Sequence, residues 1–205
     1  MKTLKDAAIS TIINESLKRA MSYTKYRELV AQLVSDKAST GELQNEEMAN
    51  YTMLNDKRMK RWDKTLKISE PISTQIKNLS SKQTWIVLTE SWCGDAAHLL
   101  PVMNKVAELN DTIEFKVVLR DQNEELMDHF LTHGGKSIPK LVMVDTETLR
   151  VKNTFGPRPI GAIQLVTDYK EKHGEITAEL KEDLQGWYNK DKGQSTIAEL
   201  AALMQ

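Results

Sequence analysis

A short apolar run turns into a helical pattern near the middle of this chain, and that junction constrains the fold most. The segment Trp85–Thr89 is apolar and rich in β-branched residues, which predicts a buried strand. Beyond it, apolar residues recur at helical spacing, at Ala97, Leu100, Val102, Met103, Val106 and Leu109. Cys93, the only cysteine among the 205 residues, stands where this predicted helix begins.

The position of Cys93 predicts a reactive thiol. The first turn of a helix leaves backbone N–H groups unpaired and carries the positive end of the helix dipole. Both favour a thiolate, and such positions lower a cysteine pKa from about 8.5 into roughly the 3.5–7.5 range. The alternative for a lone cysteine is an inert, buried, small hydrophobic side chain. The strand-to-helix junction favours the nucleophile.

The sequence around this junction alternates strands and helices. We expect strands at 84–89, 113–119, 140–145 and 149–155, and helices at 94–109, 123–133 and 160–172. Strand, helix and strand in succession predict a parallel pair joined by a right-handed crossover. The last two strands, separated by three residues, read as a hairpin. The pattern therefore predicts an α/β fold, with a central mixed sheet flanked by helices.

We divide the chain into three parts. Residues 1–80 read as a helical extension, with helices over 4–21, from Ser22 or Thr24 to about Val34, over 45–62 and from 71 to 79. Residues 81–174 form the α/β core. Residues 175–205 carry two further helices, at 175–190 and 195–204, which we expect to pack on the core.

Four separated features, in order, resemble the thioredoxin-like family. Residues 92–96 are similar to its active-site turn, W-C-G-x-C, and Pro101 matches its helix-kinking proline. Residues 137–139 resemble its cis-proline loop, and Gly156 follows a strand as in its last strand. The similarity spans roughly residues 82–173 and implies a thioredoxin-like fold with Cys93 as the catalytic residue.

Ala96 departs from the family pattern. It occupies the place of the second, resolving cysteine, and the chain has no other cysteine to replace it. An intramolecular disulfide therefore cannot form. A redox cycle must pass through a mixed disulfide between Cys93 and an outside thiol, which a second outside thiol resolves. The resemblance thus implies a monothiol member.

The resemblance also implies a peptide-docking loop at Ile138 and Pro139. In the family this loop faces the active cysteine, and the residue before the proline pairs its backbone with an extended substrate segment. Ile138 would then add a bound chain as a strand. A cis bond before Pro139 is expected, because X–Pro bonds take that form at low cost. The alternative is an ordinary proline at the start of a strand.

The side chains around Cys93 complete the predicted site. Asp95 would stabilise the first helical turn but disfavour the thiolate, or recognise a cationic group on a substrate. Arg158, whose direction two flanking prolines restrict, would offset Asp95, favour the thiolate or grip a carboxylate; the alternative is a surface arginine. With Trp92 and Gly94 of the turn, these residues are the predicted substrate-binding set.

Other polar residues are weaker candidates. Arg120, Asp121 and Lys136 lie near the carboxyl ends of predicted strands, where open α/β sheets bind ligands. His98 falls one position past the turn that would bring it under Cys93, so we do not expect it to act as a base.

Neither the histidines nor the basic run predict a second site. His129 and His133 share a face of the predicted helix 123–133, but no cysteine or carboxylate cluster accompanies them, so we expect no metal and no cofactor. The run 57–64 reads as the solvated face of a helix with Trp62 turned inward. The alternative is a contact with an acidic partner or RNA.

Composition excludes several classes of partner. The formal net charge is −1, so no bulk charge draws the chain to nucleic acid. No stretch approaches the ~18 consecutive apolar residues of a spanning helix, so we expect no membrane insertion. One cysteine without a disulfide framework fits a reducing compartment, which predicts a cytoplasmic location.

Two functions remain open. The first is thiol oxidoreductase activity through Cys93, by mixed-disulfide exchange with protein disulfides or S-thiolated proteins and a small thiol as reductant. The second is a non-catalytic thioredoxin-fold binding or scaffold module. A peroxide-sensing cysteine is a third, weaker option. The helical extension either packs against the core or forms the surface of a homodimer.

Overall fold

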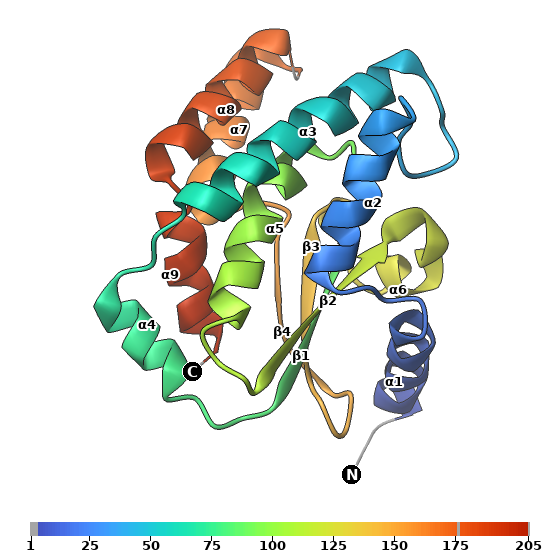
Figure 1. Cartoon of the computed structure of the whole chain (residues 1–205), viewed down its shortest axis with the longest axis vertical. Helices are drawn as coiled ribbons and strands as arrows, with labels where there is room; N and C mark the ends of the chain where they lie inside the picture. Colours follow the sequence, from blue (N-terminus) through green and yellow to red (C-terminus); the bar gives the residue numbers. More distant parts are fainter. Residues whose placement is uncertain (1–3, 176, 205) are drawn as a thin grey trace.

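A four-stranded mixed sheet organises the protein in a computed structural model that describes residues 4–175 and 177–204 (Figure 1). The strands are β1 (Gln83–Thr89), β2 (Ile113–Leu119), β3 (Lys140–Asp145) and β4 (Val151–Phe155). Their order across the sheet is β2-β1-β3-β4. β1 pairs in parallel with β2 and antiparallel with β3, and β3 pairs antiparallel with β4. The predicted mixed sheet is therefore confirmed.

Helix α5 (Gly94–Ala107) forms the crossover between the two parallel strands. All seven residues of β1 are buried, as expected of a central strand covered on both faces. Ten of the fourteen α5 residues are buried as well. Cys93 directly precedes α5, so the predicted strand-to-helix junction is packed against the core.

The remaining helices surround this centre. They are α1 (Leu4–Leu17), α2 (Tyr23–Ser35), α3 (Glu46–Thr65), α4 (Glu70–Lys77), α7 (Ile160–His173), α8 (Ala178–Asp191) and α9 (Gln194–Leu203). α3 packs on both α2 and α5, while α9 packs on α4 and α5 (Figure 1). α8 packs on α7. Helices from both ends of the chain thus lie against the helix that starts at Cys93.

Two helices end earlier than the sequence predicts. α1 stops at Leu17, because Met21 instead exchanges backbone hydrogen bonds with Val117 of β2 (2.9 and 2.8 Å). The helix predicted over 123–133 is only α6 (Glu124–Asp128), preceded by a short 3₁₀ turn. His133 has a positive φ of 50° and lies outside the helix, so the prediction that it shares a helix face with His129 is wrong.

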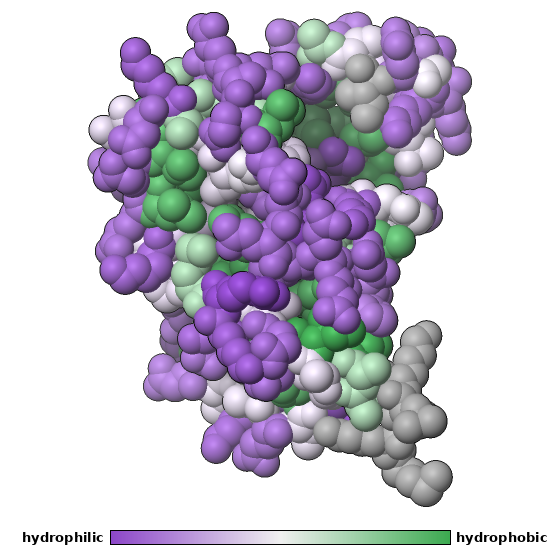
Figure 2. Space-filling model, turned by 90° about the vertical axis from the view of Figure 1, so that its right-hand side faces the viewer, coloured by the Kyte–Doolittle hydropathy of each residue, from purple (hydrophilic) through white to green (hydrophobic). Residues whose placement is uncertain are grey.

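The surface is mostly polar on the face that carries α1, α2 and α6, with hydrophobic side chains in separate patches (Figure 2). Within the described part of the chain, no helix combines the length and apolar character needed to cross a membrane. The same residues hold no group of three or more His, Cys, Asp or Glu side chains arranged to bind a metal ion.

Candidate functional site

Cys93 is the N-cap residue of α5 and faces the loop before β3. Its Sγ donates a hydrogen bond to the carbonyl oxygen of Ile138 at 3.3 Å. The peptide bond between Ile138 and Pro139 is cis, and both residues are buried. Cys93 itself is 8% exposed. The fold therefore brings the turn at Cys93 against the proline loop predicted at Ile138 and Pro139, although Cys93 and Ile138 are separated by 45 residues.

The environment of Cys93 favours the thiol over the thiolate. Burial, and then the negative charge of Asp95, raise the pKa of Cys93 to about 12. Hydrogen bonds from the backbone N–H groups of Ala96 and Asp95, and the charge of Arg158, act in the opposite direction. The predicted lowering of this pKa is therefore wrong for the resting protein. The helix-end effect is present, but burial outweighs it.

Asp95 is held by two side chains from distant parts of the chain. Arg158 contacts it in a two-pronged ion pair, Nη2 to Oδ2 at 2.6 Å and Nε to Oδ1 at 3.0 Å. The hydroxyl of Tyr188, on α8, donates a hydrogen bond to Asp95 Oδ1 at 2.7 Å. Both oxygens of the carboxylate are thereby engaged. The sequence placed Arg158 within reach of Cys93 but gave no sign of Tyr188, because α8 reaches this site only through tertiary packing.

Gly156 sets the path of the chain into Arg158. Its φ is +103°, and a Cβ at this position would lie 2.3 Å from the backbone oxygen of Pro139. Only glycine tolerates both the left-handed backbone and this close approach. The loop that carries Arg158 is thus pressed against the proline loop that faces Cys93.

A cleft of about 450 Å³ opens beside Cys93, between α3, the start of α5, α7 and α8. Its apolar lining comes from Met48, Tyr51, Trp92, Val166, Leu180 and Leu184. Its polar lining includes Cys93, Gly94, Asp95, Arg158, Arg58, Glu47, Lys181 and Gln185. Ile138 and Pro139 do not line it. The cleft therefore combines most of the predicted residues with side chains from α3 and α8 that the sequence did not single out.

Arg58 is the main cleft residue that the sequence pattern misassigned. The basic run 57–64 was expected on a solvated helix face, and Trp62 is indeed buried. Arg58, however, is half-buried and lines the cleft, with its Nη1 3.7 Å from where a Cβ on Gly94 would lie. Its position four residues before the buried Trp62 was the available signal, because residues i and i+4 share a helix face.

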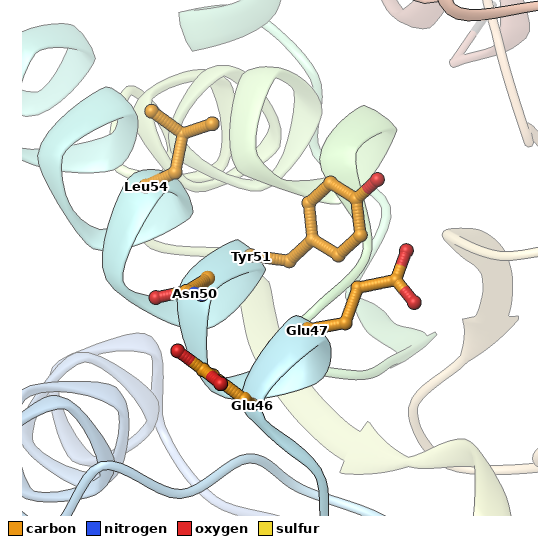
Figure 3. Close-up of a pocket in the computed structure, with 5 residues that line it drawn as sticks. All are labelled: Glu46, Glu47, Asn50, Tyr51 and Leu54. Carbon is orange, nitrogen blue, oxygen red and sulfur yellow. The ribbon is translucent and has the colours of Figure 1, made fainter.

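A second, shallower hollow lies next to the cleft on α3. It is lined by Glu46, Glu47, Asn50, Tyr51 and Leu54, which Figure 3 displays. In that view Glu47 and Tyr51 project toward the same side of the helix. These two residues belong to both hollows, so Tyr51 forms the wall between them. The lining of this hollow includes neither a thiol nor a cation.

His98 lies buried one turn into α5, against Tyr188 of α8. Its Nδ1 accepts a hydrogen bond from Trp62 Nε1 at 2.9 Å, and its Nε2 lies 2.7 Å from Gln185 Oε1. Because an indole only donates, Nε2 must carry the proton and donate to Gln185. The ring stacks on Tyr188 with centroids 4.4 Å apart. Burial lowers the pKa of His98 to about 4, so this histidine is neutral and supports α8.

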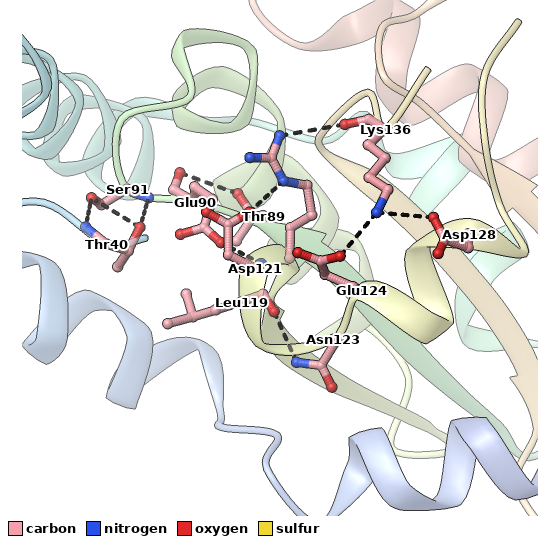
Figure 4. A network of polar contacts seen from close by, with 11 residues as sticks. Thr40, Thr89, Glu90, Ser91, Leu119, Asp121, Asn123, Glu124, Asp128 and Lys136 are labelled. Atoms are coloured by element: carbon pink, nitrogen blue, oxygen red, sulfur yellow. Dashed lines mark hydrogen bonds and ion pairs between the residues drawn. The ribbon is translucent and has the colours of Figure 1, made fainter. Parts of the chain in front are cut away.

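The turn before Cys93 is tied to the loop that precedes α3. Ser91 and Thr40 exchange hydrogen bonds, Thr40 N to Ser91 Oγ at 2.9 Å and Ser91 N to Thr40 Oγ1 at 2.8 Å (Figure 4). Asn55 of α3 donates to the Ser91 carbonyl at 2.9 Å. The loop before α3 and α3 itself therefore support the turn that leads to Cys93.

A buried carboxylate continues this network toward β2. Glu90 Oε1 accepts a hydrogen bond from Asp121 N at 2.9 Å, and burial raises the pKa of Glu90 (Figure 4). Arg120 pairs with Asp121 at 2.7 Å and lies 5.1 Å from the centroid of the Trp92 ring. Lys136 is directed instead to Glu124 and Asp128. Arg120, Asp121 and Lys136 do not line the cleft, and Arg120 contacts Trp92, which does.

The chain is similar to known proteins in sequence pattern and in fold. The family model described as thioredoxin matches residues 41–170. A crystal structure of a protein of unknown function from Pseudomonas aeruginosa has 15% sequence identity and a TM-score of 0.57, over 76% of this chain and 89% of that one. An HIV epitope-scaffold has 16% identity and a TM-score of 0.54, over 90% and 98%. These likenesses support the fold alone. No curated protein matches the chain in sequence.

Proposed function

The chain belongs to the thioredoxin family, and on that premise we propose that it is a thiol oxidoreductase that acts through Cys93 alone. The proposal rests on the position of Cys93 in the structure. Cys93 caps the N-terminus of α5, contacts the carbonyl oxygen of Ile138 and lines the cleft of about 450 Å³. Ala96, one helical turn further on, is buried and supplies no second sulfur.

The cycle has two exchange steps. In the first, the Cys93 sulfur attacks a protein disulfide or an S-thiolated protein, forming a mixed disulfide, and the proton lost by Cys93 ends on the departing thiol. In the second, a small thiol attacks the mixed disulfide, leaves with the bound group as a new disulfide, and returns the proton to Cys93. Each step breaks one S–S bond and forms one. No second protein cysteine is needed.

The resting thiol is protonated, so thiolate supply limits the rate. The pKa of Cys93 is raised to about 12, which leaves little thiolate at neutral pH. The Ala96 and Asp95 N–H groups and Arg158 stabilise the thiolate that forms.

The test measures mixed-disulfide formation on the full chain. The protein is incubated with bis(2-hydroxyethyl) disulfide from pH 7 to 10, and intact mass reports the single adduct. Addition of a small thiol should then regenerate the free protein through repeated cycles. The proposal requires that Cys93→Ser lose both steps while keeping its fold by circular dichroism. Turnover that survives in Cys93→Ser would overturn it.

A binding module is the second candidate, and one observation favours it. The Cys93 thiol is protonated and already hydrogen-bonded to Ile138, as an inert structural cysteine would be. Such a module would keep its partners and its cellular role in Cys93→Ser. Loss of activity in that variant, with partner binding retained, would separate the two functions.

The helical additions have a proposed role in either case. α3 and α8 supply walls of the cleft, so we propose that residues 1–80 and 175–205 shape the binding site around the core. A cytoplasmic location suits a lone thiol that must stay reduced. A homodimer through the extension remains a prediction, which sedimentation equilibrium would test.

A further inference from the structure

We propose that the cleft beside Cys93 binds a low-molecular-weight thiol that carries a carboxylate, and that Arg58 recognises this anion. The proposal rests on the proposed function, since it names the small thiol with which Cys93 exchanges. It also goes further, because it assigns a binding site and a recognition residue on α3.

Arg58 is a cation held in place without an anion. Its Nη1 donates to Asn55 Oδ1 at 2.9 Å, and Asn55 in turn donates to the carbonyl of Ser91, two residues before Cys93. Among the described residues, Arg58 joins no ion pair, whereas Arg27 pairs with Asp56. A fixed guanidinium presents donors that match a carboxylate.

The carboxylate of Asp95 does not neutralise Arg58 through a direct ion pair. Asp95 lines the same cleft, but its oxygens already bind Arg158 and Tyr188. Burial, and then the charge of Arg61, lower the pKa of Arg58, while Tyr51 and Asp95 act to raise it. The guanidinium is therefore partly desolvated, and its hydrogen-bond partner Asn55 is neutral. An anionic ligand would supply that partner.

The volume and the charge of the cleft suit a small anionic molecule. Lys181 Nζ donates to Tyr51 OH at 3.4 Å, which connects α8 to α3 at the rim. A volume of about 450 Å³ lies within the usual range of roughly 300–1,000 Å³ for small-molecule pockets. Lys181 adds a second positive charge, and Glu47 at the exposed rim is the cleft's only carboxylate besides Asp95. A compact anion fits these walls better than an extended protein segment.

The reaction at this site is a balanced exchange. A symmetric disulfide of the ligand gives up one S–S bond as the Cys93 sulfur forms a new one. Cys93 is oxidised to the mixed disulfide, and the second half of the ligand leaves reduced, with the proton from Cys93. Arg58 takes no part in the bond changes and acts on the carboxylate of the bound half.

The experiment compares three disulfides of similar size that differ in charge. These are 3,3′-dithiodipropionate, bis(2-hydroxyethyl) disulfide and cystamine, which are anionic, neutral and cationic. Adduct formation is followed by intact mass, and each rate is divided by that of a free reference cysteine peptide. We expect the anionic disulfide to react about tenfold faster than the neutral one, as one charge-assisted contact would give.

Variants on α3 assign the effect to Arg58. Arg58→Gln should abolish the anionic preference, and Arg58→Lys should retain part of it. Lys57→Gln removes the same charge from the neighbouring exposed position and should keep the full preference. Equal rates for all three disulfides, a cationic preference, or a preference that persists in Arg58→Gln would each overturn the proposal.

A binding measurement separates this proposal from the proposed function. 3-(Methylthio)propanoate carries the carboxylate but no exchangeable sulfur, and 3-(methylthio)propylamine is its cationic counterpart. We expect the anion to shift the amide resonance of Gly94 and the indole resonance of Trp92, and Arg58→Gln to lose these shifts. If no disulfide forms an adduct, the oxidoreductase function fails, and these shifts still decide whether the anion site exists.

Discussion

The carboxylate of Asp95 and the guanidinium of Arg158 form a two-pronged ion pair across 63 residues of sequence. Their side chains are 10% and 25% exposed, so the pair is largely withdrawn from water. Asp95 raises the pKa of Cys93 and Arg158 lowers it. The ion pair therefore sets the electrostatic balance at the single thiol of the protein.

Replacing Arg158 should make the thiol less reactive and the fold weaker. In Arg158→Gln, Asp95 keeps only Tyr188 as a partner, and loss of the positive charge raises the pKa of Cys93 further. We expect slower iodoacetamide alkylation at pH 8.5 and a loss of roughly 1–3 kcal/mol in the free energy of unfolding, as for other charged hydrogen bonds. Arg150→Gln, at an exposed position, is the control. Faster alkylation in Arg158→Gln would contradict the assigned balance.

Replacing Asp95 should have the opposite effect on the thiol. Asp95→Asn removes the negative charge that disfavours the thiolate and leaves the charge of Arg158 to favour it. We expect the pKa of Cys93 to fall and alkylation at pH 8.5 to accelerate roughly three- to tenfold. The measurement is the alkylation rate as a function of pH. An unchanged profile would mean that burial alone determines the thiol pKa.

Protonation of Cys93 should appear in the pH dependence of stability. The folded-state pKa of about 12 lies above the ordinary value of 9.0, so the contribution to stability is complete below pH 9. It is lost as the pH rises from about 9 toward 12, by up to about 1.4 kcal/mol per pH unit. Urea unfolding of the wild type and Cys93→Ser between pH 8 and 10.5 would measure it. Identical slopes for the two proteins would contradict the raised pKa.

His98 should have the opposite pH dependence, on the acid side. Its folded-state pKa of about 4 lies below the ordinary 6.5, so the neutral ring stabilises the fold above pH 6.5. This contribution is lost as the pH falls toward 4. His98→Phe should remove this slope and cost roughly 1–3 kcal/mol at pH 7, because Trp62 and Gln185 lose their partner. Titration of His98 above pH 5.5 by NMR would refute the assignment.

Gly156 should not tolerate a side chain. Gly156→Ala places a Cβ 2.3 Å from the Pro139 oxygen at a positive φ, and we expect a loss of more than about 2 kcal/mol with displacement of Arg158. Gly186→Ala is the matched control. That helical glycine of α8 has open space around it, so the change should stabilise by roughly 0.5–1 kcal/mol. Equal stability of the two variants by urea unfolding would contradict the steric argument.

Local sequence patterns were enough to predict the fold class and to nominate Cys93 as the centre of the candidate site. The β-branched run before Cys93 and the helical period after it are local patterns, and the structure has β1 and α5 there. The mixed sheet followed from the order of these elements. These predictions succeeded because hydrophobic periodicity reports which face of a segment is buried.

The acidity of Cys93 and the set of residues around it depend on long-range packing. A helix N-terminus is visible in the sequence, but the desolvation that raises the pKa depends on how closely α5 packs against the rest of the protein. Arg58 and Tyr188 lie far from Cys93 along the chain and reach its surroundings because α3 and α8 pack against α5 and α7. Burial and long-range charge are properties of the assembled core, so no local pattern encodes them.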